Sequence, residues 1–207
     1  MTAPARQLFA VIPAAGLSRR MGQHKLLLPL GDKTILHRLL ETLSNIKGLQ
    51  TIVVIRPDDD ALKQEAEKTS AIVVQPSVAP QEMRESVTVA IDFITKRFSP
   101  IETDSWMLIP ADHPVLESSL LEKFIDQWNQ CDAPVMIPTY KKKRGHPTFF
   151  RWSLAKEIHT IPNDKGLNSL VAQYANAIKE IPTNHSAVIT DIDNPEDYAT
   201  LLAMYQE

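Results

Sequence analysis

Hydrophobic positions in this chain form short continuous runs, which alternate with stretches where apolar residues recur every three or four positions. The runs predict buried strands, and the periodic stretches predict amphipathic helices. Runs without polar alternation are typical of a parallel sheet covered on both faces, so we expect an α/β fold with right-handed crossovers. The expected strands are 7–13, 51–55, 71–74, 106–109, 133–138 and 177–181, and the expected helices are 34–46, 59–68, 83–98, 118–130, 152–159, 166–175 and one that begins at Pro195.

The pattern changes between residues 140 and 150, where we expect a small hairpin. Its tip is expected to carry Lys141, Lys142, Lys143 and Arg144, and a charge run at a hairpin tip is usually a solvated face. The chain has no internal repeat and no low-complexity linker, and 207 residues favour one domain when a typical domain has ~150. We therefore expect a single domain over residues 1–207 with a small hairpin insertion.

Composition and charge exclude several classes of function. Hydrophobic residues make up 43% and charged residues 23%, which allows a sizeable core. The net charge of -3 gives no basic field for a nucleic-acid backbone, so we expect no nucleic-acid partner. No apolar run approaches the ~18 residues of a membrane span, and the first seven residues lack the apolar stretch of a signal peptide. We expect no membrane association and a cytoplasmic location.

The segment that follows the first expected strand, residues 13–25, reads PAAGLSRRMGQHK. Ligands of open α/β sheets bind beyond the carboxyl ends of strands. Small residues here let a ligand approach the backbone amides, and the basic side chains after them can hold phosphate oxygens. The spacing fits neither the G-x-G-x-x-G nor the G-x-x-x-x-G-K-[ST] pattern. We predict a polyphosphate cradle, with Arg19 equally compatible with a solvated role; its members are Ala14, Ala15, Gly16, Arg19, Arg20 and Lys25.

An aspartate follows the expected strand 106–109, in the sequence IPADHP. Asp112 would lie at the carboxyl end of a buried strand, on the same edge as the cradle. Magnesium in proteins takes one or two carboxylates together with substrate phosphate oxygens, so Asp112 is our candidate metal ligand. The alternative is a turn or helix-capping role. His113 next to it either contacts substrate or packs.

Two later segments add candidates. In Arg144-Gly145-His146-Pro147, glycine and proline favour a turn while the arginine and histidine offer donors to an anionic acceptor. The segment 191–198 reads DIDNPEDY, in which Asn194 followed by proline predicts a helix N-cap.

The pattern A-A-G-x-S-x-R-M-G-x-x-K resembles the signature of the MobA-like NTP transferases, in particular their cytidylyltransferase branch. The D-x-P, R-G-H-P and D-x-D-T-P-E-D motifs of this family resemble the other three segments. The resemblance implies a single-domain Rossmann-like three-layer fold with a mostly parallel mixed sheet. It also implies a nucleotide-binding half over about 7–115 and an acceptor-binding half over about 116–207.

The resemblance assigns roles residue by residue. Arg20 and Lys25 would bind the triphosphate and act with Asp112 in catalysis, and Ser18 would line the nucleotide pocket. Asp112 and Asp193 would bind Mg²⁺, with Asp191 as the alternative second ligand. The acceptor would be bound by Arg144, Gly145, His146 and Pro147.

The implied reaction is magnesium-dependent transfer of an NMP from an NTP to a phosphorylated small molecule, with release of pyrophosphate. CTP is the expected donor, because Ala14-Ala15-Gly16 is typical of the cytidylyltransferases and the Ala15 methyl group would narrow the base pocket. The implied acceptor is molybdopterin or the molybdenum cofactor, with a molybdoenzyme or its chaperone as a candidate protein partner.

One segment departs from the family pattern. Where G-M-x-S-S-L is usual, this chain has Glu82-Met83-Arg84-Glu85-Ser86-Val87, which would fill or recharge part of the base or acceptor site. Two alternatives therefore stay open. One is a sugar-phosphate or phosphocholine nucleotidyltransferase, and the other is a noncatalytic nucleotide- or cofactor-binding protein.

Overall fold

The computed structural model describes residues 6–162 and 164–204, with only the backbone described for Arg19 and Met204. Its main sheet has the strand order β10-β7-β9-β6-β1-β4-β5, with β8 paired to β7. These strands are β1 (Leu8–Pro13), β4 (Leu49–Val54), β5 (Ile72–Val74), β6 (Ser105–Leu108), β7 (Val135–Tyr140), β8 (Lys143–Arg144), β9 (Thr148–Arg151) and β10 (Ile178–Pro182). Within this sheet, β8 pairs antiparallel with β7, and β9 pairs antiparallel with both β6 and β7. The other strand pairs are parallel, so the expected mostly parallel mixed sheet is confirmed.

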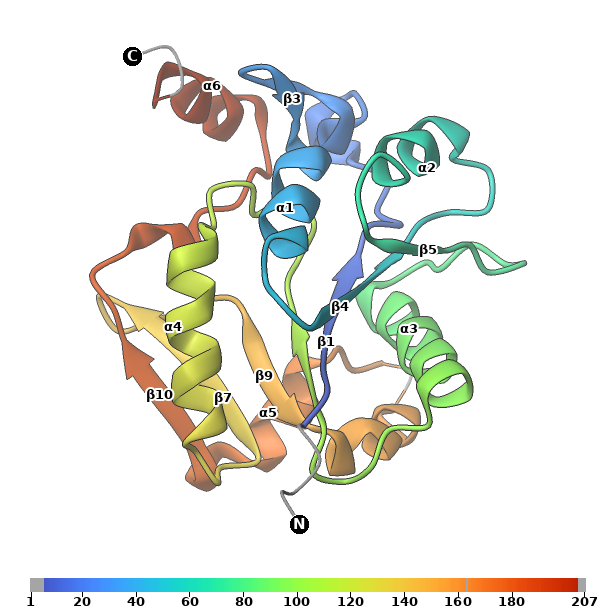
Figure 1. The fold of residues 1–207 in the computed structure, drawn as a ribbon. Coiled ribbons are helices and arrows are strands. Elements are labelled where there is room, and N and C mark those ends of the chain that lie inside the picture. Colours follow the sequence, from blue (N-terminus) through green and yellow to red (C-terminus); the bar gives the residue numbers. More distant parts are fainter. Residues whose placement is uncertain (1–5, 163, 205–207) are drawn as a thin grey trace.

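Helices cover both faces of the sheet and give three layers (Figure 1). On one face, α1 (Ile35–Ser44) and α4 (Ser118–Asn129) pack with Ala10 and Ile12 of β1 in one core. On the other face, α3 (Met83–Phe98), the 3-10 segment η3 (Trp152–Thr160) and α5 (Asn168–Gln173) share a core with Phe9 and Val11. Alternate residues of β1 thus enter opposite cores, which explains why the strand is apolar at every position from 9 to 12. The remaining helices are α2 (Asp60–Ala66) and α6 (Pro195–Met204).

The order of the strands creates a place for a ligand. The chain leaves β1 through α1 to reach β4 on one side, and returns through α3 to reach β6 on the other side. Such a reversal leaves a crevice at the carboxyl ends of the two diverging strands. The loops that begin at residues 14 and 109 therefore start side by side, because β1 pairs in parallel with β6 and Ile109 donates its backbone N–H to Val11.

Several local expectations need correction. The hairpin turn consists of Lys141 and Lys142 alone, both with positive φ, while Lys143 and Arg144 form the returning strand β8. The expected helix 152–159 is the 3-10 segment η3, and the expected helix 166–175 is shortened to α5 followed by η4 (Ala175–Ala177). A short hairpin of β2 (Pro29–Leu30) and β3 (Lys33–Thr34) was not expected. No helix in the described part of the chain is long and apolar enough to cross a membrane.

Candidate functional site

The segment after β1 forms an open loop that ends in two short 3-10 turns, η1 (Arg19–Met21) and η2 (Lys25–Leu27). Ala14 continues the sheet by donating its N–H to Val54, and Ser18 turns the chain with a φ of 49°. A Cβ added to Gly16 would meet nothing within 4 Å, so this stretch of backbone faces open space that a ligand can enter. The side chain of Arg19 lies outside the described part of the structure.

Lys25 extends from η2 into a group of oxygen atoms. Its Nζ donates to Asp112 Oδ2 at 2.6 Å, to the Ile192 carbonyl at 2.7 Å and to Asp193 Oδ1 at 3.4 Å. The Lys25 side chain is 16% exposed and that of Asp112 is 18% exposed, so this ion pair is largely shielded from water. The structure therefore brings the predicted phosphate-binding lysine onto both predicted metal ligands.

Asp193 is positioned by the start of α6. The predicted N-cap is present, because Asn194 Oδ1 accepts the backbone N–H groups of Glu196 and Asp197 at 2.9 Å. Asp197 in turn accepts the N–H groups of Asp193 and Asn194, which completes a reciprocal capping box. This cap fixes the backbone that directs Asp193 toward the cradle.

Two aspartates were candidates for the second carboxylate, and the structure places them differently. Asp193 forms an ion pair of 2.9 Å with Nη2 of Arg20, whose side chain is 73% exposed. Asp191 is exposed and makes neither this contact nor one with Lys25 among the ion pairs of the described residues. Asp193 is therefore the carboxylate that faces Asp112 across Lys25.

The pKa of the Asp112 carboxyl group lies below its usual value. Burial by itself raises its pKa, but the hydrogen bond from His113 and the charge of Lys25 outweigh burial and lower the pKa from 3.8 to about 2. His113 Nδ1 lies 3.1 Å from Asp112 Oδ1. Asp112 is therefore held on both oxygens, by His113 on one and by Lys25 on the other.

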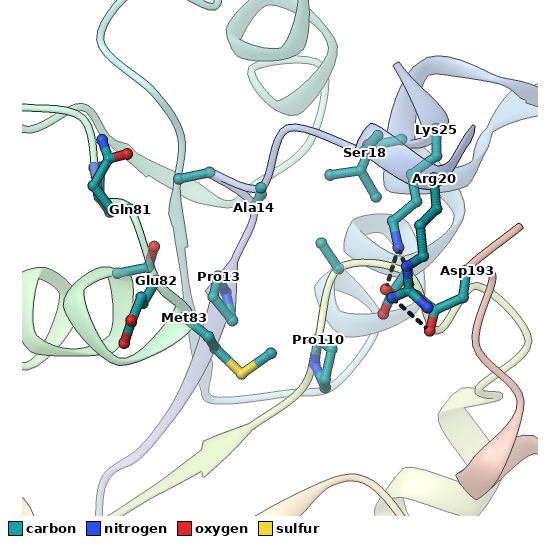
Figure 2. Close-up of a pocket in the computed structure, with 17 residues that line it drawn as sticks. Pro13, Ala14, Ser18, Arg20, Lys25, Gln81, Glu82, Met83, Pro110 and Asp193 are labelled. Atoms are coloured by element: carbon teal, nitrogen blue, oxygen red, sulfur yellow. Dashed lines mark hydrogen bonds and ion pairs between the residues drawn. The ribbon is translucent and has the colours of Figure 1, made fainter. Parts of the chain in front are cut away.

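A cavity of about 250 Å³ opens beside these groups. Figure 2 shows Arg20 and Lys25 pointing toward Asp193 on one side of the cavity, Gln81 and Glu82 on the opposite side, and Met83 between them near Pro110. Of the segment that departs from the family pattern, Glu82, Met83 and Ser86 line the cavity. The lining residues include all the predicted nucleotide-binding residues whose side chains are described: Ala14, Ala15, Gly16, Ser18, Arg20 and Lys25.

A second cavity of about 410 Å³ adjoins the first. Arg144, Gly145 and His146 line it, whereas Pro147 does not and is buried behind them. Gly145 has a steric reason to be glycine, since an added Cβ would lie 2.2 Å from the Val188 carbonyl oxygen. The two cavities share five lining residues: Arg20, Met83, Pro110, Asp112 and Asp193.

The fold and the two adjoining cavities agree with the comparisons to known proteins. A model of the MobA-like NTP transferase domain matches residues 10–178. The chain belongs to the MobA-like NTP transferase family. It is a nucleotidyltransferase of the type that includes the molybdenum cofactor and methylerythritol phosphate cytidylyltransferases.

The relatives of this MobA-like protein include two kinds of cytidylyltransferase. The molybdenum cofactor cytidylyltransferase of Escherichia coli is 23% identical over 197 residues, which is 95% of this chain and 96% of that protein. The 2-C-methyl-D-erythritol 4-phosphate cytidylyltransferase of Nitrosospira multiformis is 31% identical over 151 residues, 69% and 65% of the two chains.

Among solved structures, Rv0371c of Mycobacterium tuberculosis has a TM-score of 0.76 and 26% identity, over 95% of this chain and 98% of that chain. Rv0371c has also been solved as a complex with manganese, with a TM-score of 0.71 and 25% identity over 96% and 99%.

Two features of the site were not predicted from the sequence. The first is the direct pairing of cradle cations with the two carboxylates. The second is the stacking of His113 edge-on against His146, with ring centroids 5.0 Å apart. The D-H-P and R-G-H-P motifs each contain a histidine, which was the available signal, but nothing in the sequence placed one histidine against the other.

Proposed function

We propose that this protein transfers CMP from CTP to a phosphorylated acceptor of the molybdopterin type and releases pyrophosphate. The single observation that carries the proposal is the wall shared by the two cavities. A transfer between two substrates requires both to meet at one reacting centre. Arg20, Asp112 and Asp193 line both cavities and are the charged groups at their junction.

On the nucleotide side, the cradle would hold the triphosphate by two kinds of donor. The open backbone at Gly16 allows close approach of phosphate oxygens, and Lys25 and Arg20 supply positive charge toward the distal phosphates. Catalysis of such a transfer consists mainly of positioning and of stabilising charge on the leaving pyrophosphate. Lys25 lines the first cavity and Arg20 lines both cavities, so both cations can reach the phosphates of a nucleotide in the first cavity.

The residues present fit a divalent cation. Asp112 and Asp193 come from different loops, yet oxygens of both contact one positively charged group, the Lys25 ammonium, at 2.6 and 3.4 Å. Magnesium needs only one or two carboxylates when substrate phosphates complete its shell, so the lack of a larger acidic or histidine cluster among the described residues is compatible with this metal. Asp112 and Asp193 would hold Mg²⁺, which when bound would neutralise phosphate charge. Rv0371c, which is 25% identical to this chain, has been solved in complex with manganese, and this supports a divalent cation in the proposed reaction.

The acceptor needs no general base. A phosphate monoester has its second pKa near ~6, so the attacking oxygen is already ionised at neutral pH. The residues of the second cavity then have to orient an anion and keep it in line with the α-phosphate. Arg144 is suited to this task, although it pairs with Glu180 at 2.8 Å in the ligand-free protein.

Both relatives are cytidylyltransferases, which supports CTP as the donor of this protein, but the two relatives differ in the acceptor. The match to the molybdenum cofactor enzyme of E. coli covers 95% of this chain, which favours molybdopterin, while the higher identity of the methylerythritol phosphate enzyme supports a sugar-phosphate acceptor as the second candidate. A noncatalytic binding protein is the remaining alternative, and the altered segment 82–86, of which Glu82, Met83 and Ser86 line the cavity, is the feature that favours it.

Pyrophosphate release separates these candidates. The protein is incubated with Mg²⁺ and each of the four NTPs, with molybdopterin or 2-C-methyl-D-erythritol 4-phosphate as acceptor, and Asp112→Asn serves as the matched inactive control. We expect release with CTP and molybdopterin only. Release with the erythritol phosphate instead would identify the sugar-phosphate alternative. Nucleotide-dependent thermal stabilisation without release from any pair would support a binding protein.

A further inference from the structure

His113 lies between the proposed metal site and the acceptor cavity. Its side chain is 6% exposed and lines the second cavity. Nδ1 of His113 is 3.1 Å from Asp112 Oδ1, while the other carboxylate oxygen, Oδ2, contacts Lys25 at 2.6 Å. The two oxygens of Asp112 therefore have separate tasks, because one is held by the imidazole and the other is directed at the cationic centre.

The chemistry of the contact fixes which atom carries the hydrogen. Asp112 Oδ2 lies 2.6 Å from the Lys25 ammonium, and a carboxylate in such an ion pair can only accept hydrogen bonds. His113 Nδ1 must therefore be the donor. A carboxylate held through one oxygen loses rotational freedom about its terminal torsion and presents the other oxygen in a fixed direction. Groups that orient metal-binding carboxylates in this way commonly control metal affinity without touching the metal.

The opposite side of the His113 ring is supported by the acceptor loop. The His146 ring meets it edge-on at 83°, with 5.0 Å between centroids. His146 is itself fixed by its backbone, which donates to the Val188 carbonyl at 2.7 Å, and Gly145 permits this close approach. Burial lowers the pKa of His146 to about 4, so its ring is neutral at pH 7 and does not repel His113. The imidazole of His113 is therefore confined between Asp112 and the R-G-H-P segment.

We propose that His113 is a positioning residue: its Nδ1–H holds Asp112 in the orientation that presents Oδ2 to a divalent cation, and its ring rests on His146 of the acceptor loop. The inference rests on the proposed function, because it concerns the same carboxylate. It adds a link between the two cavities, since a shift of the acceptor loop would move His146, His113 and Asp112 together.

Three variants of His113 separate hydrogen bonding from packing. His113→Asn keeps a donor at the δ position, His113→Gln moves the donor one atom further out, and His113→Phe keeps the ring but has no donor. The measurement is Mn²⁺ affinity in the presence of a non-hydrolysable CTP analogue, followed by electron paramagnetic resonance, with kcat and KM for CTP measured in parallel. Thermal unfolding without ligand reports whether each variant folds.

We expect His113→Phe and His113→Gln to weaken Mn²⁺ binding by about 10–100-fold and to lower kcat, while His113→Asn stays close to wild type. CTP affinity without metal should be the same in all four proteins. Wild-type Mn²⁺ affinity in both Phe and Gln variants would overturn the inference while leaving the proposed function intact. If the Phe variant does not fold, equal Mn²⁺ affinity of the Asn and Gln variants is the overturning result. Absence of Mn²⁺ binding in the wild type would instead contradict the proposed function.

Discussion

Replacing Lys25 by methionine should change stability and metal binding in opposite directions. The substitution keeps the length of the side chain but removes the ammonium that contacts Asp112, Asp193 and the Ile192 carbonyl. Without it, two carboxylates face one another in a partly shielded site. We therefore expect the ligand-free protein to become less stable and its affinity for a divalent cation to rise.

The size of the stability effect of Lys25→Met can be worked out from the pKa of Asp112. Its pKa falls from 3.8 to about 2 in the folded protein, which corresponds to roughly 2–3 kcal/mol of stabilisation of the charged form at neutral pH. His113 supplies part of this stabilisation and Lys25 another part, while desolvation opposes both. We expect Lys25→Met to cost about 2 kcal/mol, which for a chain of this length lowers Tm by roughly 4–8 °C.

The assay is thermal unfolding with and without millimolar Mn²⁺ in the absence of nucleotide. In the wild type the cation has to displace an ammonium that contacts both carboxylates, whereas in Lys25→Met this ammonium is absent, so Mn²⁺ should raise Tm more in the variant. Lys33→Met is the matched control, because Lys33 forms an ion pair of 2.7 Å with Glu41 that is more exposed to solvent, and ion pairs at the surface contribute about 0–1 kcal/mol. Equal Tm values for Lys25→Met and wild type, together with equal responses to Mn²⁺, would refute the reasoning.

Three other perturbations test separate parts of the site. Gly145→Ala should destabilise the protein by about 1–3 kcal/mol and raise KM for the acceptor more than for CTP, since the new Cβ would lie 2.2 Å from the Val188 oxygen; an unchanged urea midpoint would argue against this constraint. The folded-state pKa of His146 is lowered from 6.5 to about 4. The neutral ring therefore contributes its full stabilisation above pH 6.5, and this stabilisation is lost as the pH falls from 6.5 toward 4. At pH 5 the loss should be about 2 kcal/mol in urea titrations, and His146→Phe should flatten the profile. Ala15→Gly should relax the preference for CTP over GTP in calorimetry, and equal wild-type affinity for both would contradict a narrow base pocket.

The strands and long helices were predictable because burial determines the spacing of apolar residues along the sequence. Residues 9–12 are apolar at each position since both faces of β1 are covered, and α1 buries one stripe of leucines. The β2–β3 hairpin could not be predicted in this way, because a strand of two residues is too short to show a periodic pattern. The periodicity at 152–159 reported burial correctly, but it did not distinguish a 3-10 segment from an α-helix.

The candidate site was predictable as a set of residues but not as a set of contacts. Asp112 and Lys25 were each expected at the carboxyl edge of the sheet, and topology alone brings their loops together. Their direct ion pair depends on side-chain directions, because Lys25 extends from η2 and His113 holds the Asp112 carboxylate. The contact between His113 and His146 depends on β8 and on the close approach of Gly145 to Val188, which join segments without any local pattern in common.

The ion pairs of Lys25 and Arg20 with Asp112 and Asp193 limit which ligand can bind at this site. Lys25 and Asp112 are largely shielded, and either one left unpaired would pay a desolvation cost of several kcal/mol. A nucleotide alone would draw Lys25 and Arg20 away and leave the two carboxylates facing each other. A divalent cation alone would take the carboxylates and leave the cations without partners. A nucleotide that carries its own divalent cation satisfies both sets at once, because its phosphates pair with the cations while its metal pairs with the acids. If the proposed function holds, we therefore expect these four side chains to favour the metal–nucleotide complex over either component alone.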